Sequence, residues 1–141
     1  MEVADNVIPS SNSEMAKNLF LLGHFLNNDD YISKAKQMLI NVEADVQRNI
    51  YFYANWGMVQ ALFTSPLYEV AIVGDDYKNK RKQFDEHYLP NVILLGGKTE
   101  SKLALLENKL VPGQTMIYVC RDKSCKLPVT EVEKALEQIG K

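Results

Sequence analysis

The 141-residue sequence has two cysteines, one tryptophan and no long apolar run. Two cysteines exclude a disulfide-rich scaffold, so we expect both to be thiols in a reducing compartment. The longest apolar run, residues 19–26, is interrupted by Gly23 and His24 and is too short to span a bilayer. The polar N-terminus does not have the pattern of a signal peptide. We therefore expect a cytoplasmic protein without a membrane partner.

An excess of either charge is also missing. The formal net charge is -2, and no basic stripe or acidic tail is present. Nucleic acid and anionic membrane surfaces are therefore not expected as partners. Hydrophobic residues make up 46% of the chain, which is enough for a packed interior. The length fits one ordinary domain or two small halves.

Helical periodicity fills the N-terminal part of the chain, residues 1–65. Good N-cap residues at positions 11–13 precede apolar residues at helical spacing, and a polar turn at 27–30 separates a second helix. A third segment with an apolar face covers about residues 49–64. The short link between the first two helices predicts that they are antiparallel neighbours.

Strands and helices alternate in the remaining residues, 66–141. Apolar, β-branched runs predict three strands, at residues 68–73, 92–95 and 115–120. Helices are expected from residue 75 to 87, from 100 to 110 and after the third strand. This alternation predicts parallel strands joined by right-handed crossover helices. The expected fold is α/β, with the antiparallel N-terminal helices packed on a small, mainly parallel three-stranded sheet.

Two turns follow predicted strands, where α/β sheets often bind ligands. Residues 96–99 (GGKT) resemble the end of a phosphate-binding loop, but Val92 stands where that motif requires its first glycine. A glycine-rich turn is the favoured interpretation, and a weak anion site is the alternative. Residues 75–76 are two aspartates, which repel phosphate and are interpreted as helix caps. No cofactor is therefore expected.

The two cysteines flank a polar loop near the C-terminus. Four residues separate Cys120 from Cys125, whereas a thioredoxin-type pair has two intervening residues. Neither histidine lies near them in the sequence, so no metal site is expected. Arg121 and Lys123 would favour a thiolate at Cys125, which makes a reactive thiol one alternative. A buried Cys120 in a strand and a plain loop thiol at Cys125 are favoured.

A polar loop, residues 5–13, places six short hydrogen-bonding side chains around Pro9, directly before the first helix. Such a loop caps its helix and, as an alternative, presents polar groups to a ligand. Tyr53 and Trp56 lie at the start of the third helical segment. Sugar rings stack on such aromatic side chains, although an aromatic helix face is more often part of a core.

Three stretches of the chain carry a resemblance to a known family. Residues 5–13 resemble a proline-serine-glycine-asparagine-serine loop, with Ser11 in place of the usual glycine. Residues 69–74 resemble the strand that opens the family's C-terminal tail, and residues 118–130 resemble its closing strand and turn. On these stretches the chain is similar to the C-terminal part of thioredoxin-domain-containing proteins of the spermatogenesis-associated protein 20 type.

That family combines a thioredoxin-like domain, a six-hairpin (α/α) barrel akin to glycosidases and N-acylglucosamine 2-epimerase, and a short α/β tail. The resemblance implies that residues 1–65 are the end of such a barrel and residues 66–141 the tail. Three helices cannot close a six-hairpin ring. We therefore expect a fragment, with the upstream domains of a parent protein as its missing partners.

The resemblance also implies a sugar ligand. The residues expected to contact it are Asp5, Asn6, Ser10, Asn12, Tyr53 and Trp56. The first four would line the mouth of the pocket, and either aromatic ring would offer a stacking face. A glycosidase needs two carboxylates across one bond, and only Asp5 is a candidate, so the catalytic residues stay unassigned.

Three functional hypotheses follow from the sequence. The leading one is the terminal region of a carbohydrate-related barrel protein that is not a complete enzyme by itself. The second is a scaffold or homo-oligomer, because helices from an open barrel would expose apolar surface. The third is a thiol or redox role of Cys120 and Cys125.

Overall fold

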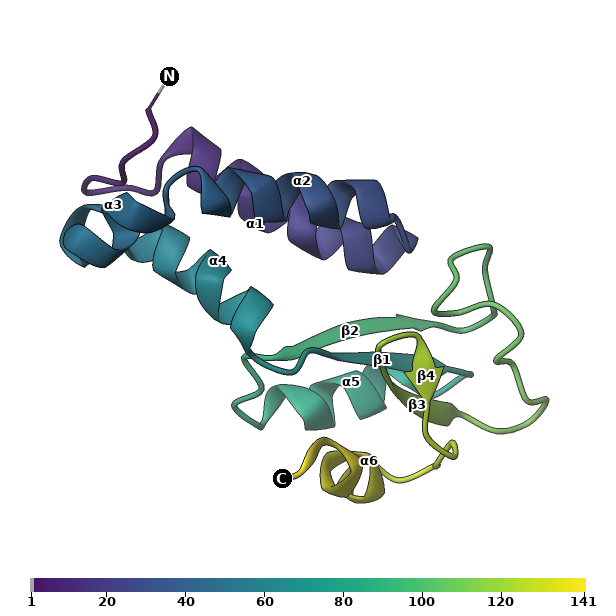
Figure 1. Ribbon diagram of the computed structural model, residues 1–141. Helices are drawn as coiled ribbons and strands as arrows, with labels where there is room; N and C mark the ends of the chain where they lie inside the picture. The colour runs from purple at the N-terminus through teal and green to yellow at the C-terminus, as the bar shows by residue number, and fades with distance from the viewer. Residues whose placement is uncertain (1) are drawn as a thin grey trace. The chain divides into compact units, whose positions relative to one another are not determined.

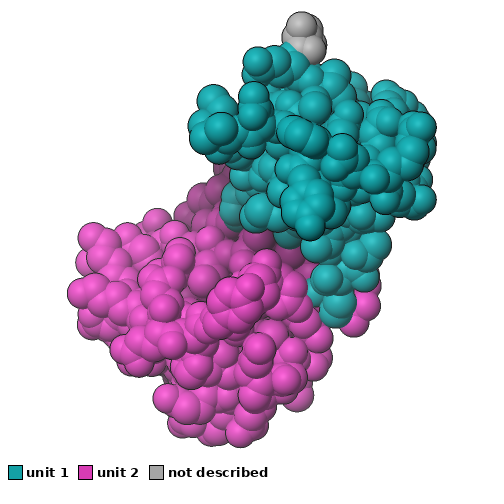
Figure 2. Space-filling view, turned by 90° about the vertical axis from the view of Figure 1, so that its left-hand side faces the viewer, with its two compact units in different colours: residues 1–66 teal, residues 67–141 magenta. Residues whose placement is uncertain are grey.

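The computed structural model describes residues 2–141. The chain divides into two compact units, coloured separately in Figure 2. Unit 1 ends at Pro66 and unit 2 is Leu67–Lys141. The division lies beside Ser65–Pro66, where the sequence pattern changes from helical to alternating. No helix in residues 2–141 combines the length and the apolar character needed to cross a bilayer.

Unit 1 is helical. Its elements are α1 (Ser11–Leu26), α2 (Asp29–Ile40), α3 (Glu43–Arg48), a 3-10 helix η1 (Ile50–Phe52) and α4 (Ala54–Thr64). The second and third predicted helices are each divided in two, because the chain turns at Asn41–Val42 and again around Tyr53. Figure 1 shows α1 and α2 side by side, as their short link predicts.

Local capping explains the α1–α2 hairpin. The Ser10 side chain accepts a hydrogen bond from the Ser13 N–H at the start of α1. Asn27 ends α1 in the left-handed conformation, and the Asn28 side chain caps the first turn of α2. Gly23 allows the two helices to approach closely. A Cβ at that position would meet a side-chain carbon of α2 and two backbone atoms.

The core of unit 1 is formed by buried side chains from four helices. They are Ala16, Leu39, Val42, Val46, Trp56 and Val59. Trp56 and Val59 on α4 are 1% and 0% exposed, so α4 is the central element of this core. Burial of a large aromatic side chain such as Trp56 stabilises the unit by removing apolar surface from water.

Unit 2 contains a four-stranded sheet and two helices. Its elements are β1 (Tyr68–Val73), α5 (Tyr77–Asp85), β2 (Val92–Gly97), β3 (Met116–Arg121), β4 (Ser124–Cys125) and α6 (Val132–Ile139). The strand order is β2-β1-β3-β4. β1 and β2 are parallel, whereas β3 is antiparallel to both β1 and β4. The α/β class is confirmed, but the mainly parallel, three-stranded sheet is wrong.

The direction of β3 follows from the segment before it. Residues 100–110, expected as a helix, form turns, so no crossover helix connects β2 to β3. A strand parallel to β2 would start at the opposite end of the sheet and would need such a crossover. An antiparallel strand can start at the same end of the sheet at which β2 finishes. The loop joins Gly97 at the end of β2 to Met116 at the start of β3, and Met116 pairs with Val73 at the end of β1.

Both faces of the sheet are covered within unit 2. Figure 1 shows α5 and α6 on the same face, where Phe84 of α5 and Leu136 of α6 are buried. On the opposite face, Leu105 and Leu106 of the β2–β3 loop pack on Ala71. Neither face therefore needs the N-terminal helices that the sequence analysis assigned to it.

Candidate functional site

The polar loop before α1 folds around a buried carboxylate. Asp5 is 5% exposed, and its Oδ1 accepts hydrogen bonds from the Ser10 N–H at 2.8 Å and the Ser13 hydroxyl at 2.6 Å. Its Oδ2 accepts from the Asn55 N–H at the start of α4, at 2.9 Å. One side chain thus joins the N-terminal loop, α1 and α4, with both oxygens occupied by donors of the same chain.

Two opposing effects act on the pKa of Asp5. Burial alone raises the pKa, but hydrogen bonds from Ser10, Ser13 and Asn55 lower it more, so the pKa lies below its ordinary value of 3.8. The carboxylate is therefore ionised at neutral pH. A general acid needs a raised pKa, so this environment suits an anchor for the loop better than an acid catalyst.

Two residues expected to contact a sugar lie inside unit 1. Ser10 and Trp56 are each 1% exposed, and the Trp56 indole N–H donates to the Val3 carbonyl at 2.8 Å. Packing and capping take up both side chains, so neither the stacking face expected at Trp56 nor the ligand contact expected at Ser10 is accessible in this structure. The loop brings Asp5 and Ser10 together as expected, but as an internal network.

Three further residues expected to contact a sugar, Asn6, Asn12 and Tyr53, keep accessible surface. Asn6 is exposed, and Asn12 and Tyr53 are partly exposed. The Asn12 amide donates to the Glu2 carbonyl at 2.7 Å, which holds the chain end against the start of α1. Sugar contact by these three residues stays a prediction.

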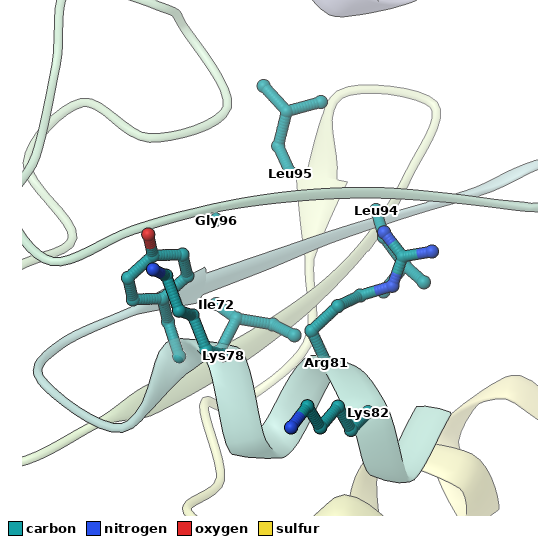
Figure 3. Close-up of a pocket in the computed structure, with 8 residues that line it drawn as sticks. Ile72, Lys78, Arg81, Lys82, Leu94, Leu95 and Gly96 are labelled. Atoms are coloured by element: carbon teal, nitrogen blue, oxygen red, sulfur yellow. The ribbon is translucent and has the colours of Figure 1, made fainter. Parts of the chain in front are cut away.

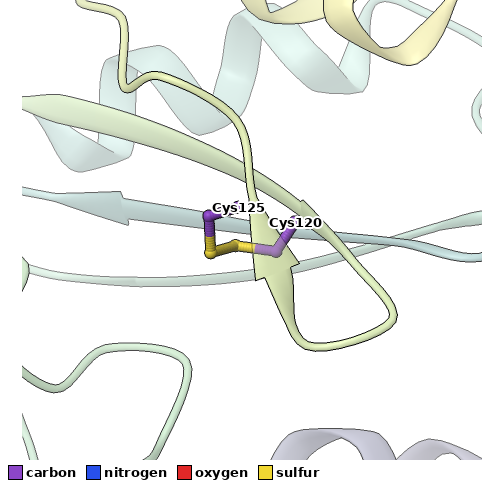
Figure 4. Close-up of a disulfide and its surroundings, with 2 residues drawn as sticks. All are labelled: Cys120 and Cys125. Carbon is purple, nitrogen blue, oxygen red and sulfur yellow. A yellow bond between two sulfur atoms is a disulfide. The ribbon is translucent and has the colours of Figure 1, made fainter.

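The two cysteines form a disulfide across the β3–β4 hairpin (Figure 4). Cys120 and Cys125 are directly opposite each other, and the turn residues Asp122 and Lys123 both have positive φ. Two such residues form the hairpin turn whose twist suits antiparallel strands. The expected thiols are therefore wrong, because a two-residue turn places the cysteines face to face. The Asp-Lys turn lacks glycine, so the residue pattern that usually predicts a two-residue hairpin turn is missing here.

A groove lies between α5 and the edge strand β2 (Figure 3). Its volume is about 350 Å³. Its lining combines an apolar floor, one tyrosine and three cationic side chains of α5: Ile72, Leu94, Leu95, Gly96, Tyr77, Lys78, Arg81 and Lys82. Gly96 leaves its part of the floor without a side chain.

The cations of the groove differ in their partners. Arg81 pairs with Asp85 one helical turn further on, with its Nη2 2.7 Å from Oδ1. Lys78 lies with its Nζ 6.0 Å from the centre of the Tyr77 ring. Within residues 2–141, neither Lys78 nor Lys82 forms an ion pair. In Figure 3, Lys78 extends toward Gly96 and Arg81 toward Leu94.

The sequence patterns described above do not predict this groove. Cations at positions 78, 81 and 82 have the spacing of one helix face, which is a signal present in the sequence. These cations line a groove only because β2 lies beside α5, and the strand order places β2 at an edge of the sheet. No group of three or more histidine, cysteine or acidic side chains in the described residues is arranged to hold a metal ion.

No family model, curated protein or solved structure matches this chain. The resemblance to the spermatogenesis-associated protein 20 type therefore stays a prediction from the sequence.

Proposed function

We propose that this chain is a binding module, and that the groove between α5 and β2 holds a partner that is anionic and partly apolar. The observation that carries the proposal is the union of an apolar floor with Lys78 and Lys82, which have no acidic partner in the described residues. This proposal develops the scaffold hypothesis stated above, with a different surface as the site of interaction, and assigns no reaction to the chain.

The two parts of the groove have different roles. Burial of apolar surface against Leu94 and Ile72 supplies most of the affinity, at about 25 cal/mol per Å² removed from water. Contacts between exposed cations and an acidic group contribute about 0–1 kcal/mol each. The cations therefore select a negatively charged partner and speed its association more than they strengthen the complex.

Octanoate and octanol test the proposal, because the two probes share an alkyl chain and differ in charge. We expect octanoate to shift the backbone amide signals of Leu94, Leu95 and Gly96 in two-dimensional NMR spectra. A ligand of this size supports a Kd of the order of millimolar, at about -0.3 kcal/mol per non-hydrogen atom. Octanol is expected to bind more weakly at the same amides.

Charge variants provide the control. Reversal of two groove cations, in Lys78→Glu with Lys82→Glu, should abolish the preference for octanoate over octanol. The matched variant, Lys36→Glu with Lys80→Glu, changes the net charge equally but alters no residue of the groove lining, and it should keep the preference. Equal binding of both probes by the unaltered chain, or octanoate shifts confined to other residues, would refute the proposal.

We also propose, as the second candidate, that unit 1 is the closing part of a sugar-related barrel. The supporting observation is a set of large apolar side chains exposed on its helices: Met15, Leu22, Leu26, Ile40 and Met58. Apolar side chains exposed on helices in this way would contact neighbouring helices in a complete barrel. Titration with N-acetylglucosamine tests the sugar contact, with the amides of Asn6, Asn12 and Tyr53 as reporters. Unchanged signals in this chain and in any longer parent would reject it.

The same exposed side chains also fit self-association, the other form of the scaffold hypothesis. Sedimentation equilibrium over a range of concentrations distinguishes the two ideas. A Met15→Lys and Leu22→Lys variant should convert a dimer to a monomer if these α1 side chains form the contact. A wild-type monomer at all concentrations would remove self-association.

A further inference from the structure

We infer that the partner of the groove is an extended acidic peptide segment that adds to β2 as a fifth strand of the sheet. The inference rests on the proposed function and goes further by naming the class of partner and its mode of binding.

The backbone of β2 presents hydrogen-bonding groups at the sheet edge. The Tyr68 N–H donates to the Asn91 carbonyl at 2.9 Å, and the Gly74 N–H donates to the Gly97 carbonyl at 3.0 Å. Odd-numbered residues of this strand thus direct their backbone groups toward β1, and the alternation directs those of Leu94 and Gly96 outward. These outward N–H and C=O groups have no backbone partner in the described residues. They suit an added strand.

The β2 edge lacks the protection that sheet edges usually have. Exposed edges are commonly interrupted by charged residues, proline or bulges, or are very short. Residues 92–97 contain neither charge nor proline, and the strand is six residues long. The opposite edge, β4, has only two residues, so it offers little length for pairing. The unprotected edge is therefore the one beside the groove.

Side-chain alternation along β2 specifies the peptide. Leu94 packs with the cluster on the α5 face, whereas Leu95 packs with the cluster on the other face. A partner residue opposite Leu94 would thus lie on the α5 face, near Arg81 and Lys78, and its neighbours would lie on the face of Leu95. The favoured sequence alternates glutamates facing α5 with apolar residues facing away. The CH2 groups of each glutamate would cover the apolar floor beside Leu94, and its carboxylate would reach the cations of α5.

Charge also distinguishes this partner from a second copy of the chain. Two β2 strands paired in antiparallel fashion are related by an axis perpendicular to the sheet, which would place both α5 helices on one face. Lys78, Arg81 and Lys82 of one copy would then face the same cations of the other. Like charges repel, so an acidic segment fits the edge better than a copy of this chain.

Peptides test strand addition. The probe is a capped peptide of alternating valine and glutamate, and its control has the same composition with all glutamates before all valines. We expect the alternating peptide to bind about tenfold more tightly in isothermal titration calorimetry. Equal affinity of the two peptides would overturn the inference, because charge and composition alone would then explain binding.

N-methylation tests the backbone contacts directly. One peptide is methylated at the glutamate nitrogens and another at the valine nitrogens. An antiparallel strand uses the N–H of the residue opposite Leu94, so methylated glutamates would abolish binding; a parallel strand uses its neighbours, so methylated valines would. Loss in one peptide alone supports strand addition and gives its direction. Equal behaviour of both methylated peptides overturns it.

The charge variants test whether the peptide uses the cations of the groove, and the comparison of octanoate with the peptide separates strand addition from the proposed function. Lys78→Glu with Lys82→Glu should weaken the alternating peptide at least about tenfold, and Lys36→Glu with Lys80→Glu should not. If octanoate binds the groove but the alternating peptide does not, strand addition fails and the proposed function stands. If neither binds, both fail. A stable dimer through β2, detected by sedimentation and unaffected by the peptide, would also overturn the inference.

Discussion

Replacement of Asp5 by alanine removes the acceptor that joins the N-terminal loop, α1 and α4. Three donors lose their partner: the Ser10 N–H, the Ser13 hydroxyl and the Asn55 N–H. A buried donor without an acceptor costs about 1–3 kcal/mol. The Ser13 hydroxyl still lies within reach of the Ser10 carbonyl, so two backbone donors are left without an acceptor. We therefore expect Asp5→Ala to lower the free energy of unfolding by about 2–6 kcal/mol.

Urea unfolding followed by far-UV circular dichroism measures this change, and tryptophan fluorescence reports on unit 1 through Trp56. Asp45→Ala is the matched control, since Asp45 pairs with Arg48 on the surface of α3. An exposed pair of this kind contributes about 0–1 kcal/mol. A loss for Asp5→Ala no larger than that of the control would refute the account of Asp5 as an anchor.

The pH dependence gives a second measurement of the same anchor. The pKa of Asp5 is lowered in the folded chain, so its contribution is complete above the ordinary value of 3.8 and is lost as the pH falls through the lower folded pKa. The stability difference between the unaltered chain and Asp5→Asn should therefore be constant near neutral pH and shrink below about pH 4. A difference that grows under acid would contradict the sign of the pKa shift.

Two further predictions concern single contacts. Reduction of the Cys120–Cys125 disulfide, or its replacement by two serines, should lower the free energy of unfolding by about 2 kcal/mol, because the bond closes a short ring. Denaturation with and without reductant measures this change, and an unchanged midpoint would contradict it. Gly23→Ala should destabilise the chain by about 1–3 kcal/mol, because the new Cβ would meet Ile32. Alanine normally favours a helix, so a gain in melting temperature would contradict the close approach of α1 and α2.

Local patterns account for the elements that the sequence predicted well. The first two helices follow from capping residues and helical spacing, which act within a few residues of the chain. The strands at 68–73, 92–97 and 116–121 follow from apolar, β-branched runs. Residues 100–110 have leucines at helical spacing, yet the segment forms turns whose leucines pack on the second face of the sheet. Tertiary packing overrides periodicity there.

The features of the candidate sites show the same difference between local properties and tertiary contacts. The sequence by itself determined that polar residues 5–13 gather before α1 and that cations 78, 81 and 82 share a face of α5, because both are local properties. Only the tertiary structure decided that Asp5 is buried by α4, that Cys120 meets Cys125, and that β2 is an edge. The physical reason is that strand direction and order arise from contacts between distant residues, which propensity and periodicity do not encode.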